Sequence, residues 1–163
     1  MNEEYSYVSE KEIKIAINDL LNKTFPDVPV YGRDTVQGYV RPCFFTDMYI
    51  VSEEEVNFST VSKVINCFIT FFQKDNEYDE ILDLNVIKAL KTNLILNDPQ
   101  KRHMMLKVGD RFLKVQTVET DYVGTENNIL EITLQFNFLD NSIILDERTT
   151  IERAVVDLIN EKN

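Results

Sequence analysis

Glycine and proline are scarce in this chain of 163 residues, which contains four of each. Disordered and linker-rich chains use these two residues heavily, so the composition argues against both classes. Hydrophobic residues make up 44% of the chain and include ten Phe and seven Tyr. This is enough apolar surface for a sizeable core, and at this length a single core is still efficient. We therefore expect one ordered domain over residues 1–163.

Long apolar runs are also absent, since no stretch approaches the roughly 18 consecutive apolar residues of a membrane span. The segment MNEEYSYVSEKE at the start lacks the basic and apolar regions of a secretion signal. The sequence therefore predicts no membrane association. We expect a protein that is made and kept in a cytoplasm, or in a particle assembled there.

Residues with catalytic or metal-binding chemistry are few. Cys43 and Cys67 lie in predicted strands, and without a secretion signal they are expected to be reduced core thiols. The only histidine, His103, stands between Arg102 and Met104, which favours a structural role. No CxxC or HxxxH pair offers a metal site, and no glycine-rich nucleotide motif is present. We therefore expect no catalytic residue, no metal and no cofactor.

The chain is acidic, with a formal net charge of -11. Nucleic-acid binding relies on Lys and Arg to neutralise phosphates, so specific binding to nucleic acid is not expected. An acidic surface still suits a conduit through which DNA passes without adhering. The run Glu53, Glu54 and Glu55 lacks the ligand spacing and the glycine of an EF-hand loop. We expect this run in an exposed loop over residues 52–59.

Two helices are predicted in the first hundred residues. Ser9 and Glu12 form a capping box before an apolar stripe at helical spacing, and Pro26 ends this helix, predicted over 9–25. The second helix is predicted over 76–96, with Asp75 or Asn76 as its cap. Its expected apolar face consists of Tyr78, Leu82, Val86, Ala89 and Leu90.

The C-terminal extension 140–163 is predicted to contain a third helix. A capping box at Thr149 and Glu152 precedes apolar residues at the i, i+3, i+4, i+7 and i+8 positions. This stripe either completes the core of its own chain or docks on a neighbouring subunit. Its members are Ile151, Ala154, Val155, Leu158 and Ile159.

Strands are predicted within 28–31, 43–72 and 103–138. Residues 61–72 are apolar on both faces, which is typical of a central strand covered by helices on part of each face. A two-residue turn at Gly109-Asp110 predicts a hairpin. The order α-β-β-β-α-β-β-β-α predicts an α/β fold of the α+β type: a mostly antiparallel or mixed sheet packed with two helices, plus a C-terminal helix.

These features together resemble the phage tail terminator family, found in phages and phage-derived particles of Gram-positive bacteria. The resemblance covers residues 10–139 and does not include the C-terminal helix. It consists of short motifs in a fixed order: FPD at 25–27, VY at 30–31, QG at 37–38, PCFF at 42–45 and FFQK at 71–74.

The resemblance implies a structural virion protein with an α/β sandwich fold. Tail terminators of long-tailed phages form rings, typically hexamers, on the head-proximal end of the tail tube. They stop tube polymerisation and provide the joining surface for the head connector. The implied partners are the chain itself, the tail tube protein, the head–tail connector protein and, in a contractile tail, the sheath protein. The implied location is the head-proximal end of a virion tail, or of a phage-derived particle, assembled in the host cytoplasm.

A ring needs two different surfaces on each subunit, because its contacts are heterologous. The polar loop 32–41 is free to face a neighbour. Residues 101–114 carry five basic residues against one acid, which is either a solvated face or a contact with the acidic run of another copy. The candidate contact residues are Arg33, Asp34, Gln37, Arg41, Glu53, Glu54, Glu55, Lys101, Arg102, Lys107, Arg111, Lys114, Ile151, Val155 and Leu158.

Two other functions stay open at this point. A head–tail connector or tail-completion protein shares the expected features of a terminator, but it should bind the portal side rather than tube ends. A non-viral adaptor that binds one protein partner would also need exposed loops and no catalytic residues. Ring formation distinguishes it from a terminator, because an adaptor has no reason to form a closed ring.

Overall fold

The structure is a computed structural model that describes residues 7–35, 37–75, 78–126 and 128–141. These residues form two helices and six strands, which confirms the predicted α+β class. The predicted C-terminal helix lies outside the described residues. In chain order the elements are α1 (Glu10–Thr24), β1 (Val30–Gly32), β2 (Cys43–Asn57), β3 (Thr60–Phe72), α2 (Glu80–Asn97), β4 (Met105–Val108), β5 (Arg111–Val123) and β6 (Ile129–Asn141).

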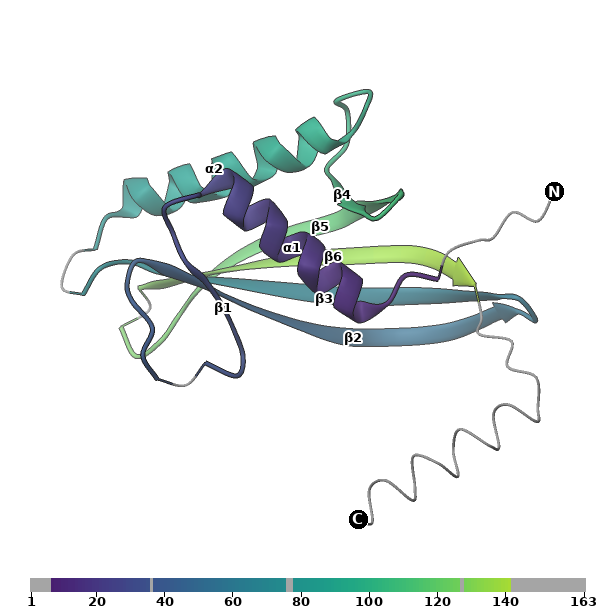
Figure 1. Cartoon of the computed structure of the whole chain (residues 1–163), viewed down its shortest axis with the longest axis horizontal. Helices are drawn as coiled ribbons and strands as arrows, with labels where there is room; N and C mark the ends of the chain where they lie inside the picture. Colours follow the sequence, from purple (N-terminus) through teal and green to yellow (C-terminus); the bar gives the residue numbers. More distant parts are fainter. Residues whose placement is uncertain (1–6, 36, 76–77, 127, 142–163) are drawn as a thin grey trace, which may run out of the picture.

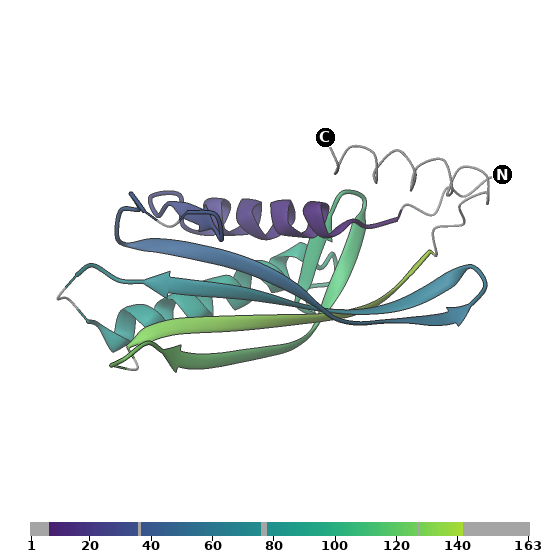
Figure 2. The same ribbon diagram turned by 90° about the horizontal axis from the view of Figure 1, so that it is seen from below.

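The six strands form one mixed sheet with the order β1-β2-β3-β6-β5-β4. β1 runs parallel to β2, and all other neighbouring strands are antiparallel. β5 pairs with β4 at its start and with β6 from Val115 onward, with a register shift between Val115 and Thr117. Figures 1 and 2 show that the sheet is long and strongly twisted and curls around the helices as a half-barrel.

The core lies between the two helices and the concave face of this sheet. β6 has the clearest pattern, since Leu130, Ile132, Leu134 and Phe136 are all 0% exposed and the residues between them are not buried. Alternate residues of β3 from Ile65 to Phe71 are buried in the same way. Both helices add their apolar stripes to this core.

α1 begins with the capping box that we predicted. The Ser9 hydroxyl accepts the Glu12 backbone N–H, and the Glu12 carboxylate accepts the Ser9 backbone N–H at 2.8 Å. The helix ends at Thr24, because the residue before Pro26 is biased away from helical backbone angles. The residues that α1 buries are Ile13, Ile17, Leu20 and Leu21.

α2 begins at Glu80, later than the predicted start at residue 76. Its cap is Asp79, whose carboxylate accepts the Ile81 backbone N–H at 2.9 Å. The side-chain amide of Gln73 holds the backbone of Asp79, accepting its N–H and donating to its carbonyl, both at 2.8 Å. This clamp fixes the cap at Asp79 rather than at Asp75 or Asn76.

The predicted apolar face of α2 is right at Val86 and Leu90, which are buried, and wrong at Tyr78 and Leu82. Tyr78 precedes the helix and is 51% exposed, and Leu82 is 40% exposed. Residues three and four apart share one face of a helix, and Asp83 takes the place on this face that the prediction gave to Leu82. The residues that α2 buries are Asp83, Val86, Leu90 and Leu94.

The strands differ from the predicted boundaries in three places. β1 spans Val30–Gly32 rather than 28–31, β2 continues through the expected loop 52–59 as far as Asn57, and β6 runs to Asn141 instead of ending at 138. β3 is central, as its pattern predicted, but both helices pack on one of its faces. Its outer face is half-buried at Val64, Phe68 and Phe72.

The hairpin of β4 and β5 forms around the predicted two-residue turn. Leu106 lies opposite Leu113, and Lys107 lies opposite Phe112. The two-residue turn contains Gly109 with a φ of 57°, a left-handed conformation that glycine adopts without steric cost.

Candidate functional site

The hairpin of β2 and β3 projects beyond both helices (Figure 2). We call residues 49–61 the arm. Three of its apolar side chains, those of Tyr49, Val56 and Phe58, are 54%, 56% and 79% exposed. Exposed apolar residues that gather on one projecting element mark an interaction site more often than a solvated surface. The arm is therefore the first candidate assembly surface.

The outer edge of β2 is largely open in the described residues. β1 pairs only with Phe44–Thr46, so no described strand lies beside β2 on this side from Asp47 to Asn57. An open edge of this length can pair with a strand of another chain. Charged residues on an edge limit indiscriminate pairing, and the acidic run lies on this edge.

The acidic run lies in the arm and not in a loop. Pairing with β3 sets Glu53 opposite Lys63 and continues the strand past Glu55, which overrides the low strand propensity of glutamate. Glu53 also lies 3.8 Å from the Lys63 ammonium. Glu54 and Glu55 are exposed, and no ion pair within the described residues includes them.

The pleat of the β4–β5 hairpin divides the predicted basic patch. Lys107 and Lys114 share the outer face of the hairpin and are both exposed. Arg111 lies opposite Val108, on the face that turns to the core. Its guanidinium is not available to another subunit in the way that we predicted.

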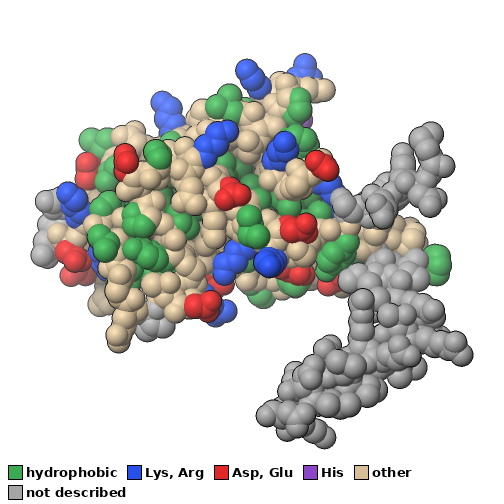
Figure 3. All heavy atoms as spheres, in the orientation of Figure 1, with side chains coloured by type: hydrophobic (Ala, Val, Ile, Leu, Met, Phe, Trp, Pro, Cys, Tyr) green, Lys and Arg blue, Asp and Glu red, His purple; other side chains and the backbone are tan. Residues whose placement is uncertain are grey.

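Lys101 and Arg102 are also exposed, but they lie in the loop between α2 and β4, away from the hairpin strands. The Asp98 carboxylate organises this loop by accepting the backbone N–H groups of Gln100, Arg102 and His103. Figure 3 shows Lys and Arg side chains gathered over α2 and this loop. The predicted basic segment thus forms two separate basic surfaces and one internal arginine.

A buried ion network at the base of the arm joins β2, β3, β5 and β6. The Asp140 carboxylate lies 2.8 Å from Arg111 Nη1 and 3.3 Å from Lys63 Nζ. It also accepts the Val8 backbone N–H at 3.1 Å, which ties the segment before α1 to the end of β6. Asp140 and Lys63 expose 1% and 2% of their side chains, whereas Glu53, the fourth charge, is 48% exposed.

Lys63 keeps its charge in this network. Burial has the largest effect on the pKa of Lys63 and lowers it, but the attractions of Tyr7 and Asp140 together raise it by more. The pKa of Lys63 therefore lies above its ordinary value. The Lys63 ammonium also lies 4.1 Å from the centre of the Tyr7 ring. Lys63 and Asp140 were missed as candidate residues, although the alternation of β3 already placed Lys63 on the same face as Ile65.

The loop between β1 and β2 folds over the outer face of the sheet. The ring of Tyr39 lies 5.2 Å from the Phe45 ring and 6.2 Å from the Phe72 ring. Arg41 stacks on Phe72 at 4.9 Å and pairs with Asp75 at 2.8 Å. This second, smaller apolar cluster explains why β3 is apolar on both faces although no described helix packs on the outer one.

The four candidate residues of this loop therefore differ in how available they are for contact with another protein. Arg41 is used inside the chain, as described. Arg33 pairs with Asp47 at 3.5 Å but remains 78% exposed in its side chain, so this pair is weak. Asp34 and Gln37 are exposed and can contact another protein.

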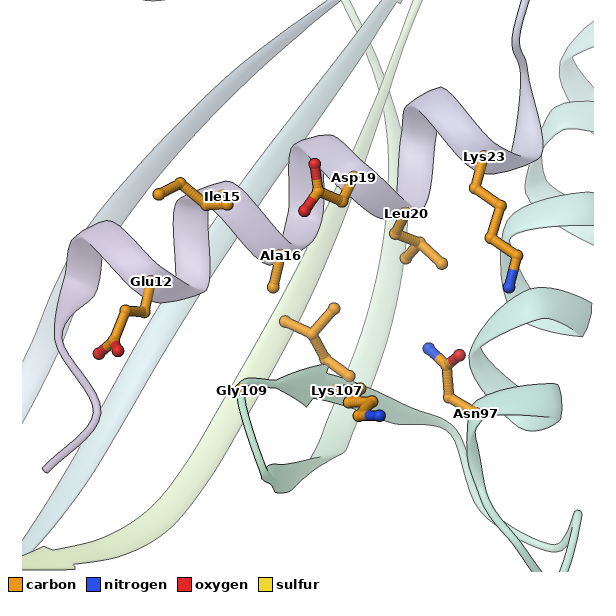
Figure 4. A pocket seen from close by; sticks show the side chains of 10 residues that line it. Glu12, Ile15, Ala16, Asp19, Leu20, Lys23, Asn97, Lys107 and Gly109 are labelled. Atoms are coloured by element: carbon orange, nitrogen blue, oxygen red, sulfur yellow. The ribbon is translucent and has the colours of Figure 1, made fainter. Parts of the chain in front are cut away.

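A groove with a volume of about 340 Å³ runs between α1 and β4 (Figure 4). Ile15, Ala16 and Leu20 line its α1 side, and Leu106 lines the side of β4. The groove is apolar along its floor and charged at its rim. The rim residues are Glu12, Asp19, Lys23 and Lys107.

A family model described as "Phage tail terminator protein" matches residues 12–149. The chain belongs to the phage tail terminator family. The resemblance seen in the sequence is thereby confirmed. The family consists of structural phage tail proteins, so this terminator is a virion component that assembles with other tail and head proteins.

Other comparisons add little to this assignment. No curated protein matches this terminator. One solved structure is similar at 12% identity with a TM-score of 0.44, covering 85% of this chain and 99% of that chain. The assignment to the family therefore rests on the family match.

The two cysteines and the histidine that the sequence analysis singled out lie in different environments. Cys43 and Cys67 are free and buried, and burial raises both thiol pKa values, that of Cys67 to about 12. His103 is exposed in the α2–β4 loop. Among the described residues, no group of three or more His, Cys, Asp or Glu side chains is arranged to hold a metal ion. No described helix is long and apolar enough to cross a membrane.

Asp83 of α2 predicts a pH dependence of stability. Its side chain is 0% exposed, and its Oδ1 accepts Gln73 Nε2 at 2.8 Å, whereas Oδ2 accepts no hydrogen bond in the described residues. Burial raises the pKa of Asp83 above 3.8, and the Gln73 hydrogen bond opposes this shift. The folded state therefore holds this proton more tightly than the unfolded chain does. The protonated Asp83 carboxyl therefore contributes to the free energy of unfolding. This contribution is fully present below pH 3.8 and is lost as the pH rises through the pKa of Asp83 in the folded state.

The free energy of unfolding of the Asp83→Asn variant should therefore increase relative to that of wild type as the pH rises from 4 to 7. Urea unfolding of both proteins across this range measures the difference. An Asp110→Asn variant, at the exposed turn of the β4–β5 hairpin, serves as the control. A difference between Asp83→Asn and wild type that stays constant with pH would contradict the assignment of Asp83.

Proposed function

We propose that this protein is a tail terminator that forms a closed ring, a hexamer, on the head-proximal end of the tail tube. The ring stops polymerisation of the tube and provides the joining surface for the head connector, and in a contractile tail it also meets the end of the sheath. The observation that carries this proposal is the family match over residues 12–149.

The arm supports an assembled state. Tyr49, Val56 and Phe58 expose more than half of their surface on an element that projects from the body of the subunit. Covering such residues in a heterologous contact stabilises a ring, because each subunit then offers its arm to one neighbour and receives the arm of the other. The open edge of β2 adds backbone hydrogen-bonding groups to the same surface.

The available charges suggest which surface receives the arm. Glu54 and Glu55 carry acidic groups on the arm that take part in no ion pair among the described residues, and Lys107 and Lys114 carry exposed basic groups on the β4–β5 hairpin. We propose that these two sets meet across the subunit contact. Arg111 and Glu53 are excluded from the pair, because both already bind charges of their own chain.

The remaining exposed candidates are assigned to the other contacts of the ring. Asp34 and Gln37 lie in the β1–β2 loop, and Lys101 and Arg102 lie in the α2–β4 loop. We propose that these loops face the tube, the sheath or the connector. Ile151, Val155 and Leu158 lie outside the described residues.

The direct test mixes the purified protein with purified tail tubes and images the mixture by negative-stain electron microscopy. We expect one cap at one end of each tube, because a terminator recognises the last tube ring at the head-proximal end. The mass of the free protein, measured by light scattering, serves as a reference, since a tube end can template a ring that does not form alone. A protein that ignores tube ends and binds the portal would support a head–tail connector instead.

A further inference from the structure

Of the residues that line the groove between α1 and β4, only Lys107 at the rim belongs to the proposed ring contacts, and the floor of the groove is apolar. Ile15 is 48% exposed at its edge, although the apolar stripe of α1 otherwise packs into the core. The charges at the rim cancel, with two acids and two lysines. An occupant of this groove therefore gains mainly from apolar contact rather than from charge.

The chain leaves the described structure close to one end of this groove. β6 ends at Asn141, and the preceding residue, Asp140, lies 2.8 Å from Arg111. Gly109, which lies two residues before Arg111, lines the groove. Asp140 also binds the Val8 backbone N–H at 3.1 Å, immediately before α1 begins. The C-terminal segment thus starts beside the corner where α1 begins and β4 ends.

The C-terminal segment has the pattern and the length to fill the groove. Residues 151–159 carry five apolar residues at helical spacing behind the Thr149–Glu152 capping box. The ten residues from Asn141 to Ile151 span up to about 33 Å when extended. α1, which forms one wall, is only about 22 Å long at 1.5 Å per residue. The linker is therefore long enough to reach any part of the groove.

We propose that residues 149–160 bind as an amphipathic helix in the α1–β4 groove of their own chain. A short linker gives an intramolecular segment an effective concentration in the millimolar range, far above that of other chains in solution. The family match ends at residue 149, so this stripe lies outside the matched region. The bound segment shields Ile15 and the groove floor from other partners, and it does so whether or not the protein forms a ring.

Disulfide trapping in the full-length protein tests this inference. Ile15→Cys is combined in turn with Ile151→Cys, Val155→Cys and Leu158→Cys, which samples the three candidate registers. The native thiols of Cys43 and Cys67 are buried and do not compete. At least one pair should form an intrachain disulfide about tenfold faster than the matched control, as expected for a tethered segment at high effective concentration.

The control combines Ile81→Cys with the same three C-terminal cysteines. Ile81 is 67% exposed on α2, and it lies sixteen residues before Asn97, about 24 Å along the helix from the groove. Equal rates for the Ile15 and Ile81 pairs would overturn the proposal. Disulfide-linked dimers in place of intrachain bonds would also overturn it, because they would place the segment on a second copy.

A second measurement does not depend on the register. In the full-length chain with the single exchange Ile15→Cys, the rate of maleimide labelling reports how well residue 15 is covered. Adding Val155→Asp and Leu158→Asp should raise this rate about tenfold, because charged residues disfavour burial of the stripe. An unchanged rate would show that the segment does not cover the groove.

Discussion

Replacing Asp140 by alanine is expected to lower the free energy of unfolding by about 3–5 kcal/mol, the usual cost of leaving a buried charge without its partner. Lys63 exposes 2% of its side chain and would lose the carboxylate that lies 3.3 Å from its ammonium. The nearest remaining acid, Glu53, lies 3.8 Å away and is half-exposed, so it compensates only in part. The Val8 backbone N–H would lose its acceptor as well.

Urea unfolding followed by circular dichroism measures this loss, which corresponds to a fall of about 10 °C in the midpoint of thermal unfolding. Lys63→Met should cost less than Asp140→Ala, because Asp140 would keep its 2.8 Å contact with Arg111. The double variant Lys63→Met with Asp140→Ala should recover part of the stability lost in Asp140→Ala, since no buried charge is then unpaired.

Arg33→Ala is the matched control for a surface ion pair. Arg33 pairs with Asp47, but its side chain is 78% exposed, and such pairs contribute about 0–1 kcal/mol. If Asp140→Ala cost no more than Arg33→Ala, solvent would have to reach Lys63, and the interpretation of a buried network would be wrong.

The sequence predicts the fold well wherever a local signal acts alone. The capping box at Ser9 and the Gly109-Asp110 turn each determine their element through neighbouring residues, and each is present as predicted. The family resemblance belongs to the same category, because short motifs such as PCFF and FFQK are read directly from the chain.

The wrong predictions concern elements whose structure depends on contacts with residues outside their own segment. The start of α2 depends on the Gln73 side chain binding the backbone of Asp79, a contact that no capping pattern reveals. The acidic run is a strand because β3 pairs with it and Lys63 neutralises Glu53, which a local reading of three glutamates does not anticipate. Strand propensity depends on such context more than helix propensity does.

The candidate site was predictable in part. The alternation of side chains along a strand places Arg111 on the core face of the hairpin and Lys107 and Lys114 on the outer face. The division of the basic patch was therefore predictable from the sequence. The pairing of Arg111 with Asp140 could not be predicted, because the two residues lie 29 positions apart in the sequence. The exposure of the apolar residues of the arm could not be predicted either, because their strand pattern does not show where the helices stop covering the sheet.

Reversing the two lysines on the outer face of the β4–β5 hairpin is expected to abolish capping of tube ends. The variant Lys107→Glu with Lys114→Glu would turn the proposed attraction to Glu54 and Glu55 into repulsion. An exposed ion pair contributes about 0.2–1 kcal/mol, so the reversal costs roughly 1–2 kcal/mol at each contact. Because a closed ring repeats the contact at every subunit, these costs add up around the ring.

The controls separate this contact from a general effect of charge. Lys88→Glu with Lys91→Glu changes the net charge equally on the exposed lysines of α2 and should leave capping intact. Adding Glu54→Lys and Glu55→Lys to the hairpin variant restores opposite charges across every contact and should restore the caps. The fraction of capped tubes in negative stain, measured at low salt and again at high salt, where exposed pairs are screened, provides the readout. Full capping by the hairpin variant at low salt would exclude this pairing and leave the apolar side chains and the open edge of the arm to close the ring.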